Sequence, residues 1–450
     1  MTAARAQQKL DQFMTGLIRR NPGEPEFHQA VREVTESLIP FVMEHPAYEE
    51  AQILERLTEP DRIITFRVTW QDDAGRVRAN RAWRVQFNNA IGPYKGGLRF
   101  HPTVTQSVLK FLGFEQIFKN SLTGLPMGGA KGGADFSPKG KSPQEIGRFC
   151  QAFMQELYRY IGPDTDVPAG DIGVGKNEIS ILFGHYIKLT QKWTGALTGK
   201  GCHFGGSAGR AEATGFGCIY FLGHMLDQEN KELNGKRVAI SGAGNVALHA
   251  ARKAIELDAK VVSLSDSSGT MHFADGMNQE LLDQIDDWKN NQRKSLSEFD
   301  SGKAGSFLED QKPWGLECDI ALPCATQNEL DEDDARNLVD NKVMMVCDGA
   351  NMPLTAKAQK ILHEANVPHA PGKASNAGGV AVSGLEQSQN AQRLRWDTEN
   401  VDKRLREIMA KIHKDCIENS PDGKIVNYRD GANLASFKRV AETMNAFWLS

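Results

Sequence analysis

Three lysines in the first half of the chain lie beside or between glycine-rich segments. Lys95 stands in GPYKGGLRFHP, and Lys131 stands between two glycine pairs in GLPMGGAKGGADF. Lys119 lies between them in a segment with a helical apolar period, three residues after Gln116 and on the same helix face. Three cations that converge in this way suit the binding of a small dicarboxylate.

Lys131 is the candidate general base. A lysine acts as a base only when it loses its proton near neutral pH, and both burial and neighbouring cations favour that loss. We expect Lys131 in a loop whose glycines let a substrate approach closely and leave little room for water. Taken alone, Lys119 could instead form a salt bridge with Glu115, and Lys95 could be an exposed turn residue.

Asp171, in the segment PAGDIGVG, is the candidate partner for proton transfer. Its alternative role is to form an Asx turn that caps a loop. We expect the segment 165–175 to be a second loop of the site. A lysine base, an acid and a cofactor site together indicate hydride transfer at a carbon that bears an amine.

A dinucleotide-binding motif follows in the second half. The predicted strand in KRVAIS leads into Gly242-Ala243-Gly244-Asn245-Val246-Ala247, which has the form G-x-G-x-x-A, and a helix follows. The first glycine permits the tight turn, the second lets a pyrophosphate approach, and the helix N-terminus attracts its charge. Asp266 follows 24 positions after Gly242, as the motif requires. A glycine turn in an unrelated α/β protein is the alternative.

The residues after this motif bear on the choice between NAD and NADP. Asp266 alone favours NAD, because a carboxylate accepts the ribose hydroxyls and repels a 2′-phosphate. The segment Ser265–Ser268 is rich in hydroxyl donors, however, and the cations Lys289, Arg293 and Lys294 follow it. On balance these residues favour NADP.

Composition limits the class of protein. The chain has 450 residues, enough for two or three domains, and a formal net charge of −4, without the basic clusters of a nucleic-acid-binding protein. No segment approaches the ~20 apolar residues of a membrane span. Its seven cysteines include no C-x-x-C pair, and the histidines and cysteines lack metal-ligand spacing. We therefore expect reduced thiols, no metal, and a cytoplasmic location.

The elements that position these residues follow from periodicity. The first ~50 residues are predicted helical, residues 62–88 form a β-hairpin around Asp-Asp-Ala-Gly, and residues 107–122 form a helix. From residue 211 short apolar strands alternate with helices, which indicates a parallel α/β sheet. A long amphipathic helix covers residues 399–419, and one more helix reaches the C-terminus.

Several long motifs resemble those of the hexameric glutamate dehydrogenases, and most closely the NADP-dependent bacterial and lower-eukaryotic type. They are GPYKGGLRFHP, GLPMGGAKGG, DVPAGDIGVG, SGAGNVA, ALPCATQNEL and APGKASNAGGVAVSGLEQSQN. The resemblance covers the chain from about residue 10 to its end. It implies an α/β fold with two domains: an N-terminal α/β substrate-binding and assembly domain over residues 1–205, completed by the C-terminal helix 430–450, and a Rossmann-like dinucleotide-binding domain over residues 206–429, with the active site in a closing cleft.

The resemblance also implies roles for the matching positions. Lys131 would activate water and stabilise charge at Cα, and Asp171 would carry protons to and from the amine. Lys95 and Ser383 would bind the distal carboxylate, and the α-carboxylate end would be held by Gln116, Lys119 and the backbone around Gly170. The cofactor contacts implied by the resemblance are Thr214, Asn245, Asn351 and Asn376. The glycine motif and the residues after it add Gly242, Gly244, Val246, Ser265, Asp266 and Lys289 as candidate cofactor contacts.

The implied activity is the reversible, NADP-dependent deamination of L-glutamate to 2-oxoglutarate and ammonia by a homohexamer. Two other functions remain open. One is a related dehydrogenase of leucine, phenylalanine or valine, which should lack a cation for the side-chain carboxylate. The other is an inactive relative that serves as a regulatory or binding subunit. Lys95 with Ser383 argues against the first, and intact Lys131 and Asp171 argue against the second.

Overall fold

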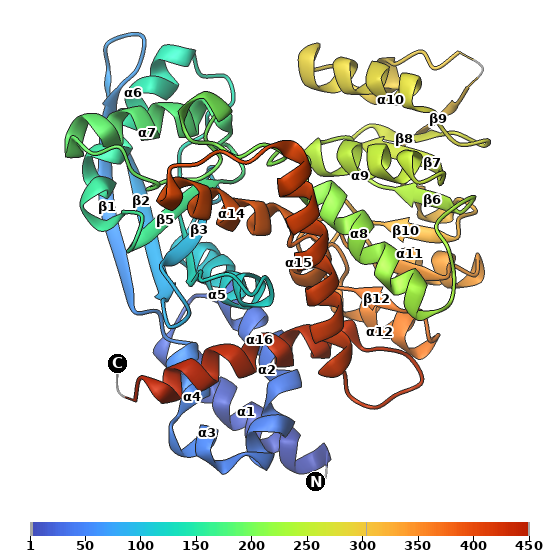
Figure 1. Ribbon diagram of the computed structural model, residues 1–450, viewed down its shortest axis with the longest axis horizontal. Helices are drawn as coiled ribbons and strands as arrows, with labels where there is room; N and C mark the ends of the chain where they lie inside the picture. Colours follow the sequence, from blue (N-terminus) through green and yellow to red (C-terminus); the bar gives the residue numbers. More distant parts are fainter. Residues whose placement is uncertain (1–2, 303, 449–450) are drawn as a thin grey trace. The chain divides into compact units, whose positions relative to one another are not determined.

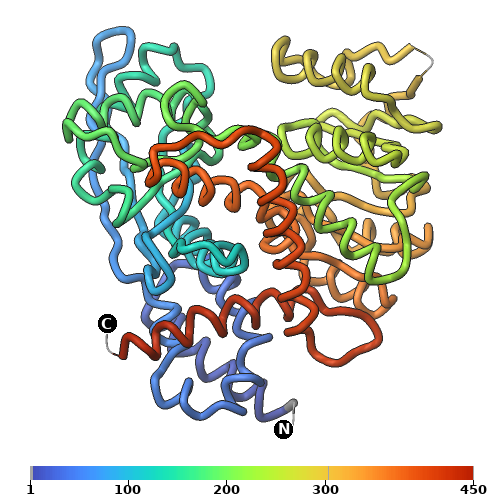
Figure 2. The backbone as a smooth tube through the Cα atoms, viewed as in Figure 1, coloured from blue at the N-terminus to red at the C-terminus, as the bar shows by residue number. Residues whose placement is uncertain are grey.

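The computed structural model describes residues 3–302 and 304–448, and the chain divides into two compact units (Figures 1 and 2). The first unit contains Met1–Ala208, Val382–Val401 and Asn433–Ser450, and the second contains Gly209–Ala381 and Asp402–Ala432. The resemblance predicts residues 382–401 in the second domain. They count with the first unit because Ser383 and Glu386 bond to residues of the 198–200 segment.

Four helices form the N-terminal part of the first unit, as the periodicity predicted. Their bounds are α1 Ala3–Arg20, α2 Pro25–Glu44, α3 Pro46–Glu50 and α4 Ile53–Leu57. Helix α2 buries one apolar face, and Phe27 on that face contacts the rings of Phe87 and Phe114 at centroid distances of 6.0 and 6.1 Å. These rings attach the helical segment to the sheet described next.

The first unit contains a five-stranded sheet with the order β1-β2-β4-β3-β5. The strands are β1 Arg62–Gln71, β2 Val77–Asn88, β3 Tyr94–Phe100, β4 Gly129–Ala134 and β5 Asp166–Gly170. Strands β1 and β2 pair antiparallel, which confirms the predicted hairpin, whereas β3 pairs in parallel with both β4 and β5. The middle position therefore belongs to β4, the glycine-rich segment that contains Lys131.

Helices cover both faces of this sheet. Helix α5, Gln106–Leu122, packs on β2 and β4, and its N-terminus is capped by the Thr105 hydroxyl. Helices α6, Pro143–Leu157, and α7, Lys176–Thr190, build a second core on the other face. In that core the rings of Phe149 and Phe153 each lie 5.1 Å from the ring of Phe100. The sheet is thus a middle layer between α5 on one face and α6 and α7 on the other.

The second unit contains a seven-stranded sheet with the order β12-β11-β10-β6-β7-β8-β9. Strands β12, β11, β10, β6 and β7 are parallel, which confirms the predicted parallel α/β sheet, and β8 and β9 extend it antiparallel. The strands are β6 Arg237–Ile240, β7 Lys260–Asp266, β8 Gly269–His272, β9 Ser306–Glu309, β10 Ile320–Leu322, β11 Met345–Cys347 and β12 His369–Ala370.

The helices of the second unit cover this sheet (Figure 1). They are α8 Ala213–Gln228, α9 Asn245–Glu256, α10 Gln279–Asp286, α11 Glu332–Asp340, α12 Ala356–Glu364 and α13 Gly372–Ser375. Strand order reverses at β6, because β7 follows it on one side and β10 lies on the other. In open parallel sheets this switch point, at the carboxyl ends of the strands, is the usual place for a ligand.

Three more helices complete the chain: α14 Gly378–Gln392, α15 Thr398–Glu418 and α16 Tyr428–Ala446. The part of α16 in the first unit packs against the end of α5, where the Arg439 guanidinium donates to the Ser121 carbonyl at 2.7 Å. Among the described residues, no helix is both long and apolar enough to cross a membrane.

Candidate active site

Lys131 lies on strand β4 and not in a loop, so the predicted local structure was wrong. Its glycine neighbours meet protein atoms and not open space. A Cβ on Gly129 would lie 2.9 Å from the Ile117 nitrogen, and one on Gly132 would lie 2.9 Å from side-chain atoms of Arg84 and Leu98. The glycines therefore let the middle strand fit closely between its neighbours and α5, which corrects the expectation that they face the substrate.

Strand register places the candidate residues on one face of the sheet. Lys131 pairs with Val85 on β2, and Leu98 pairs with Gly132, so Lys95 and Arg99 on β3 point to the same side as Lys131. Asp171 directly follows β5 on that side. The predicted loop at 165–175 is therefore partly strand.

Gly97 makes room for the central pair of this site. A Cβ at Gly97 would lie 2.9 Å from the Asp171 Cβ, 3.3 Å from the Lys131 Nζ and 2.8 Å from the Gly170 carbonyl oxygen. In this position a larger residue would push the lysine away from the aspartate. The close approach of Lys131 and Asp171 therefore depends on a glycine in the neighbouring strand.

Lys131 and Asp171 form an ion pair in which Nζ lies 3.1 Å from Oδ2. The Lys131 side chain is only 8% exposed, and the Asp171 side chain is 19% exposed. Burial lowers the pKa of the Lys131 ammonium below its usual range. Asp171 opposes this effect, and the positive charges of Arg99 and Arg84 lower the pKa further. This is the electrostatic environment that a general base requires.

Asp171 also accepts a hydrogen bond from Arg99, whose Nε lies 2.8 Å from Oδ2. Burial raises the pKa of the Asp171 carboxyl, but the positive charges of Lys131 and Arg99 outweigh this effect and hold the pKa below its usual range. The carboxylate is therefore ionised at neutral pH and can accept a proton from an amine.

Lys95 is buried, which excludes the exposed turn that its sequence allowed. Its ammonium donates to the Val167 carbonyl at 3.0 Å and to the Thr198 hydroxyl at 2.8 Å. The Thr198 hydroxyl lies 2.5 Å from the Ser383 hydroxyl. The structure thus brings Lys95 and Ser383 together, with Thr198 between them, on the sheet face that carries Lys131.

Gln116 and Lys119 lie half-buried on α5, one turn apart, as their spacing predicted. The Gln116 amide donates to the Asn120 side-chain oxygen at 2.7 Å, which fixes the orientation of Gln116. Gly170 is the last residue of β5, directly before Asp171.

In the second unit, the glycine motif follows β6 at the switch point and fits a dinucleotide. Gly242 has a φ of 84°, a left-handed conformation that favours glycine, and its N–H donates to the Ser265 hydroxyl at 2.9 Å. Gly244 is exposed at the start of α9, and an added Cβ would have no atom within 4 Å. The helix N-terminus is therefore open to a pyrophosphate.

Asp266 has all its acceptor positions occupied by groups of this chain. Oδ2 accepts from Lys289 at 2.6 Å and from the Leu296 N–H at 2.8 Å, and Oδ1 accepts from the Ser268 N–H at 2.9 Å and its hydroxyl at 2.5 Å. Burial raises the pKa of the Asp266 carboxyl, but these donors lower it to about 2. Lys289 and Asp266 form a neutral pair. A carboxylate that binds the ribose hydroxyls of NAD would instead need a free acceptor position.

The remaining predicted cofactor residues also lie in the second unit. The Asn376 amide donates to the Asn351 side-chain oxygen at 3.0 Å, so these two residues meet. The exposed Asn245 donates to the Ala211 carbonyl at 2.6 Å, which ties the start of α9 to the start of α8, near Thr214. Val246 follows in the first turn of α9.

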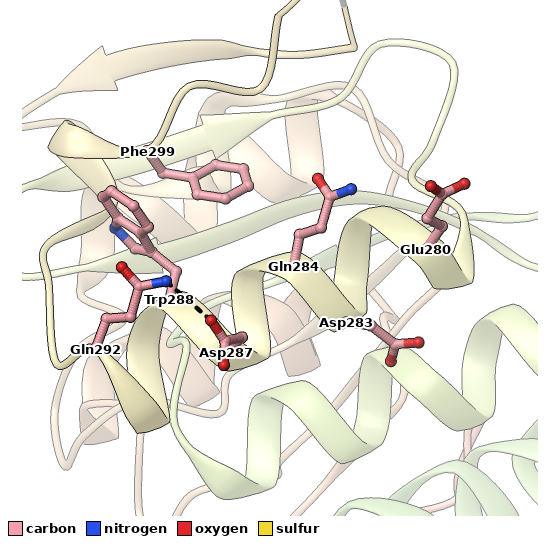
Figure 3. Close-up of a pocket in the computed structure, with 7 residues that line it drawn as sticks. All are labelled: Glu280, Asp283, Gln284, Asp287, Trp288, Gln292 and Phe299. Atoms are coloured by element: carbon pink, nitrogen blue, oxygen red, sulfur yellow. Dashed lines mark hydrogen bonds between the residues drawn. The ribbon is translucent and has the colours of Figure 1, made fainter.

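A separate groove of about 720 Å³ lies along α10 (Figure 3). Acidic and amide side chains follow the helix, and the rings of Trp288 and Phe299 close one end. Although Trp288 precedes Lys289 in the chain, none of the predicted site residues lines this groove.

Sequence reasoning missed Arg99 and Thr198. Arg99 follows Lys95 by four residues within a strand, so a period-two interpretation of YKGGLRF would have placed both on one face. Thr198 carried no comparable signal, because it lies in an irregular segment 103 residues away from Lys95 in sequence.

A Rossmann-like unit with an open glycine turn, together with a buried lysine–aspartate pair, defines the class as a dinucleotide-dependent oxidoreductase. Residues 205–447 match the family model described as Glutamate/Leucine/Phenylalanine/Valine dehydrogenase, and residues 60–188 match Glu/Leu/Phe/Val dehydrogenase, dimerisation domain. The chain belongs to the Glu/Leu/Phe/Val dehydrogenase family.

Individual relatives are similar over nearly the whole chain. The NADP-specific glutamate dehydrogenase of Psychrobacter sp. is 55% identical, covering 94% of this chain and 96% of its own. The NAD-specific glutamate dehydrogenase of Bacteroides fragilis is 53% identical, covering 97% and 98%. The crystal structure of Plasmodium falciparum glutamate dehydrogenase superimposes with a TM-score of 0.96 at 48% identity, covering 98% and 95%.

Proposed function

We propose that this protein is an NADP-dependent glutamate dehydrogenase, which interconverts L-glutamate with 2-oxoglutarate and ammonium. The similarity to glutamate dehydrogenases at 53% to 55% identity supports the activity. Because these relatives include both NADP-specific and NAD-specific enzymes, the choice of cofactor needs a separate argument from the residues of this chain.

The observation that carries the substrate assignment is the polar group formed by Lys95, Thr198 and Ser383. A buried ammonium with two adjacent hydroxyls suits a carboxylate, because charge-assisted hydrogen bonds are strong where water is excluded. An apolar amino-acid side chain offers this ammonium and these hydroxyls no hydrogen-bond acceptor. Lys131 and Asp171 lie on the same face, as a substrate with reacting groups at its other end requires.

In the proposed reaction each residue acts on a defined atom. Lys95 and Ser383 hold the distal carboxylate, and Gln116, Lys119 and the backbone at Gly170 hold the α-carboxylate. In its neutral form, Lys131 takes a proton from water as the water attacks the imine carbon of the substrate. Asp171 exchanges a proton with the substrate nitrogen. The resulting carbinolamine collapses to 2-oxoglutarate and ammonia.

The cofactor contacts are proposed for the second unit. The residues at the switch point fit a dinucleotide: Gly242 makes the turn, Gly244 leaves space, and the N-terminus of α9 with Asn245 faces a pyrophosphate. Thr214, Val246, Asn351 and Asn376 would make the further contacts. When bound, the nicotinamide accepts or supplies the hydride at the substrate Cα.

The state of Asp266 supports NADP over NAD. A carboxylate that recognises ribose hydroxyls needs a free acceptor position, whereas both oxygens of Asp266 already accept two hydrogen bonds each. Its charge is also balanced by Lys289, which reduces the repulsion of a 2′-phosphate. Lys289, with the hydroxyls of Ser265 and Ser268, is therefore the proposed phosphate-binding group.

We further propose the division of labour that goes with this activity. Residues 1–205 with the helix 430–450 bind substrate and form subunit contacts, Ser383 is added to the substrate site, and the rest of residues 206–429 bind the cofactor. The family model that matches residues 60–188 is described as a dimerisation domain, which supports self-association. A homohexamer is the expected assembly, and sedimentation equilibrium would measure its mass.

The test is the absorbance of the reduced nicotinamide with 2-oxoglutarate and ammonium, comparing NADPH with NADH. Rapid loss of NADPH with slow loss of NADH is expected. Turnover of 2-oxo acids with apolar side chains in preference to 2-oxoglutarate would replace glutamate by leucine, phenylalanine or valine as substrate. Absence of turnover with every combination would favour an inactive subunit.

A further inference from the structure

A single carboxylate oxygen receives two cations in the first unit. Asp171 Oδ2 lies 2.8 Å from Arg99 Nε and 3.1 Å from Lys131 Nζ. All three side chains are largely buried, with exposed fractions of 17% for Arg99, 19% for Asp171 and 8% for Lys131. Solvent therefore screens their interactions only weakly.

Counting charges shows what the second cation does. With Arg99 present, one carboxylate faces two cations, so the cluster becomes neutral when Lys131 loses its proton. Without Arg99, Lys131 and Asp171 would form an ordinary ion pair, and deprotonation would leave a buried carboxylate uncompensated. The positive charge of Arg99 therefore favours the neutral form of Lys131, which an ion pair with Asp171 alone would disfavour.

Other charged groups lie on the elements around Lys131, but among the described contacts only Arg99 shares the Asp171 carboxylate oxygen with it. Arg84 also lowers the pKa of Lys131, but its side chain lies on the opposite face of the sheet and is bonded to Asp166, not to Asp171. On α5, which packs on β4, Lys110 is paired with Glu24 at 2.6 Å. Glu115 and Lys119 are half-buried on the same helix, and Lys95 bonds to Thr198.

We infer that Arg99 is a positioning residue for the reaction: it occupies Asp171 Oδ2 so that Asp171 does not hold Lys131 in its protonated form. This inference rests on the proposed function for its kinetic consequence, but the electrostatic claim stands on the geometry alone. A merely structural role for Arg99 would predict lower stability and an unchanged titration of Lys131.

The test compares Arg99→Gln, which removes the charge and keeps hydrogen-bond donors, with Arg99→Lys, which keeps the charge. In Arg99→Gln the low-pH limb of kcat/KM for glutamate oxidation should move up by about one pH unit, because one like charge is lost beside the lysine. At pH 7 the rate should therefore fall about tenfold and recover at higher pH. Arg99→Lys should keep the limb near its original position.

A second readout does not depend on turnover. Trace acetylation of Lys131, followed by mass spectrometry across pH, measures its titration directly. The midpoint should rise in Arg99→Gln and stay in place in Arg67→Gln, a matched control on the exposed edge strand β1. If Arg99→Gln fails to fold, the same comparison is made with Arg99→Lys and Arg99→Met.

An unchanged acetylation midpoint in the charge-removing variants would overturn the inference. If the midpoint rises in Arg99→Gln but the wild-type protein turns over no amino acid, the electrostatic role is supported and the proposed function is rejected. A raised midpoint with a shifted pH profile would support both.

Discussion

Each unit places a lysine against an aspartate, but the two pairs differ in what else bonds to the carboxylate. Asp266 receives Lys289 and three neutral donors from Ser268 and Leu296, so one negative charge meets one positive charge. Asp171 receives Lys131 and the second cation Arg99. The second cation, together with burial, favours loss of the Lys131 proton.

The difference between the two pairs fits the different roles proposed for Lys289 and Lys131. A lysine that keeps its charge suits the binding of a phosphate, whereas a lysine that can lose its proton suits the activation of water. The glycines of the two units also differ in what occupies the space beside them. Gly129 and Gly132 make room for atoms of the protein, while Gly244 leaves its space open at a helix N-terminus. One type of residue thus builds a rigid support in the first unit and an open binding surface in the second.

The largest expected effect comes from Lys131→Met, which retains bulk and removes the base. The kcat for glutamate oxidation should fall by about 10²- to 10⁴-fold, the usual contribution of a general base. NADPH binding, measured by its fluorescence, and the unfolding temperature should change little. The matched change Lys289→Met should leave kcat within a few-fold.

Retention of kcat within tenfold in Lys131→Met would break the comparison, because the two lysines would then act alike.

The next effect concerns substrate choice. Lys95→Leu removes the ammonium that bonds to Thr198, so kcat/KM for glutamate should fall by about 100-fold or more, as for loss of a buried charged partner. The rate with norleucine, which resembles glutamate in length but lacks the carboxylate, should rise relative to glutamate. Initial rates with both substrates measure the change.

Ser383→Ala is the graded control for Lys95→Leu, since it removes a neutral hydroxyl next to Thr198. It should lower kcat/KM for glutamate about tenfold, near the upper value for one neutral hydrogen bond. If Lys95→Leu lowers kcat/KM equally for glutamate and norleucine, Lys95 has a structural role and does not select the substrate.

The sequence predicted much of the fold because its patterns are local. The hairpin at 62–88, the N-terminal helices and the parallel sheet all follow from periodicity within short segments. The prediction of a loop for the glycine-lysine segment was wrong because its glycines are required by close contacts with distant parts of the chain. Tertiary packing overrides the low strand propensity of glycine at β4.

The site was predictable where chemistry and spacing coincide, as for the candidate base Lys131. Some contacts between distant segments were not predictable. Thr198 reaches Lys95 across 103 residues, and Asp266 is neutralised by Lys289 through a hydrogen bond that no spacing rule predicts. Long-range pairing depends on how strands and helices pack, which periodicity does not encode.

A further prediction tests the second pair through Lys289→Ser. Loss of a charged hydrogen-bond donor should raise KM for NADPH by about 10- to 100-fold, because such bonds contribute about 1.5–3 kcal/mol. The variant also frees an acceptor position on Asp266, which can then repel the 2′-phosphate or accept a ribose hydroxyl. KM for NADH should therefore stay equal or fall.

Lys294→Ser is the matched control, since its ammonium lies 4.1 Å from the centre of the Trp288 ring and not at Asp266. It should change KM for NADPH by less than about threefold, the scale of an exposed cation–π contact. The double variant Lys289→Ser with Asp266→Ser separates the two effects of Lys289. If it restores NADPH binding relative to Lys289→Ser, the penalty comes from the exposed carboxylate; if it does not, Lys289 itself contacts the phosphate. Equal KM changes for NADPH and NADH in Lys289→Ser would show that the pair supports the fold of the β7 region and does not select the cofactor.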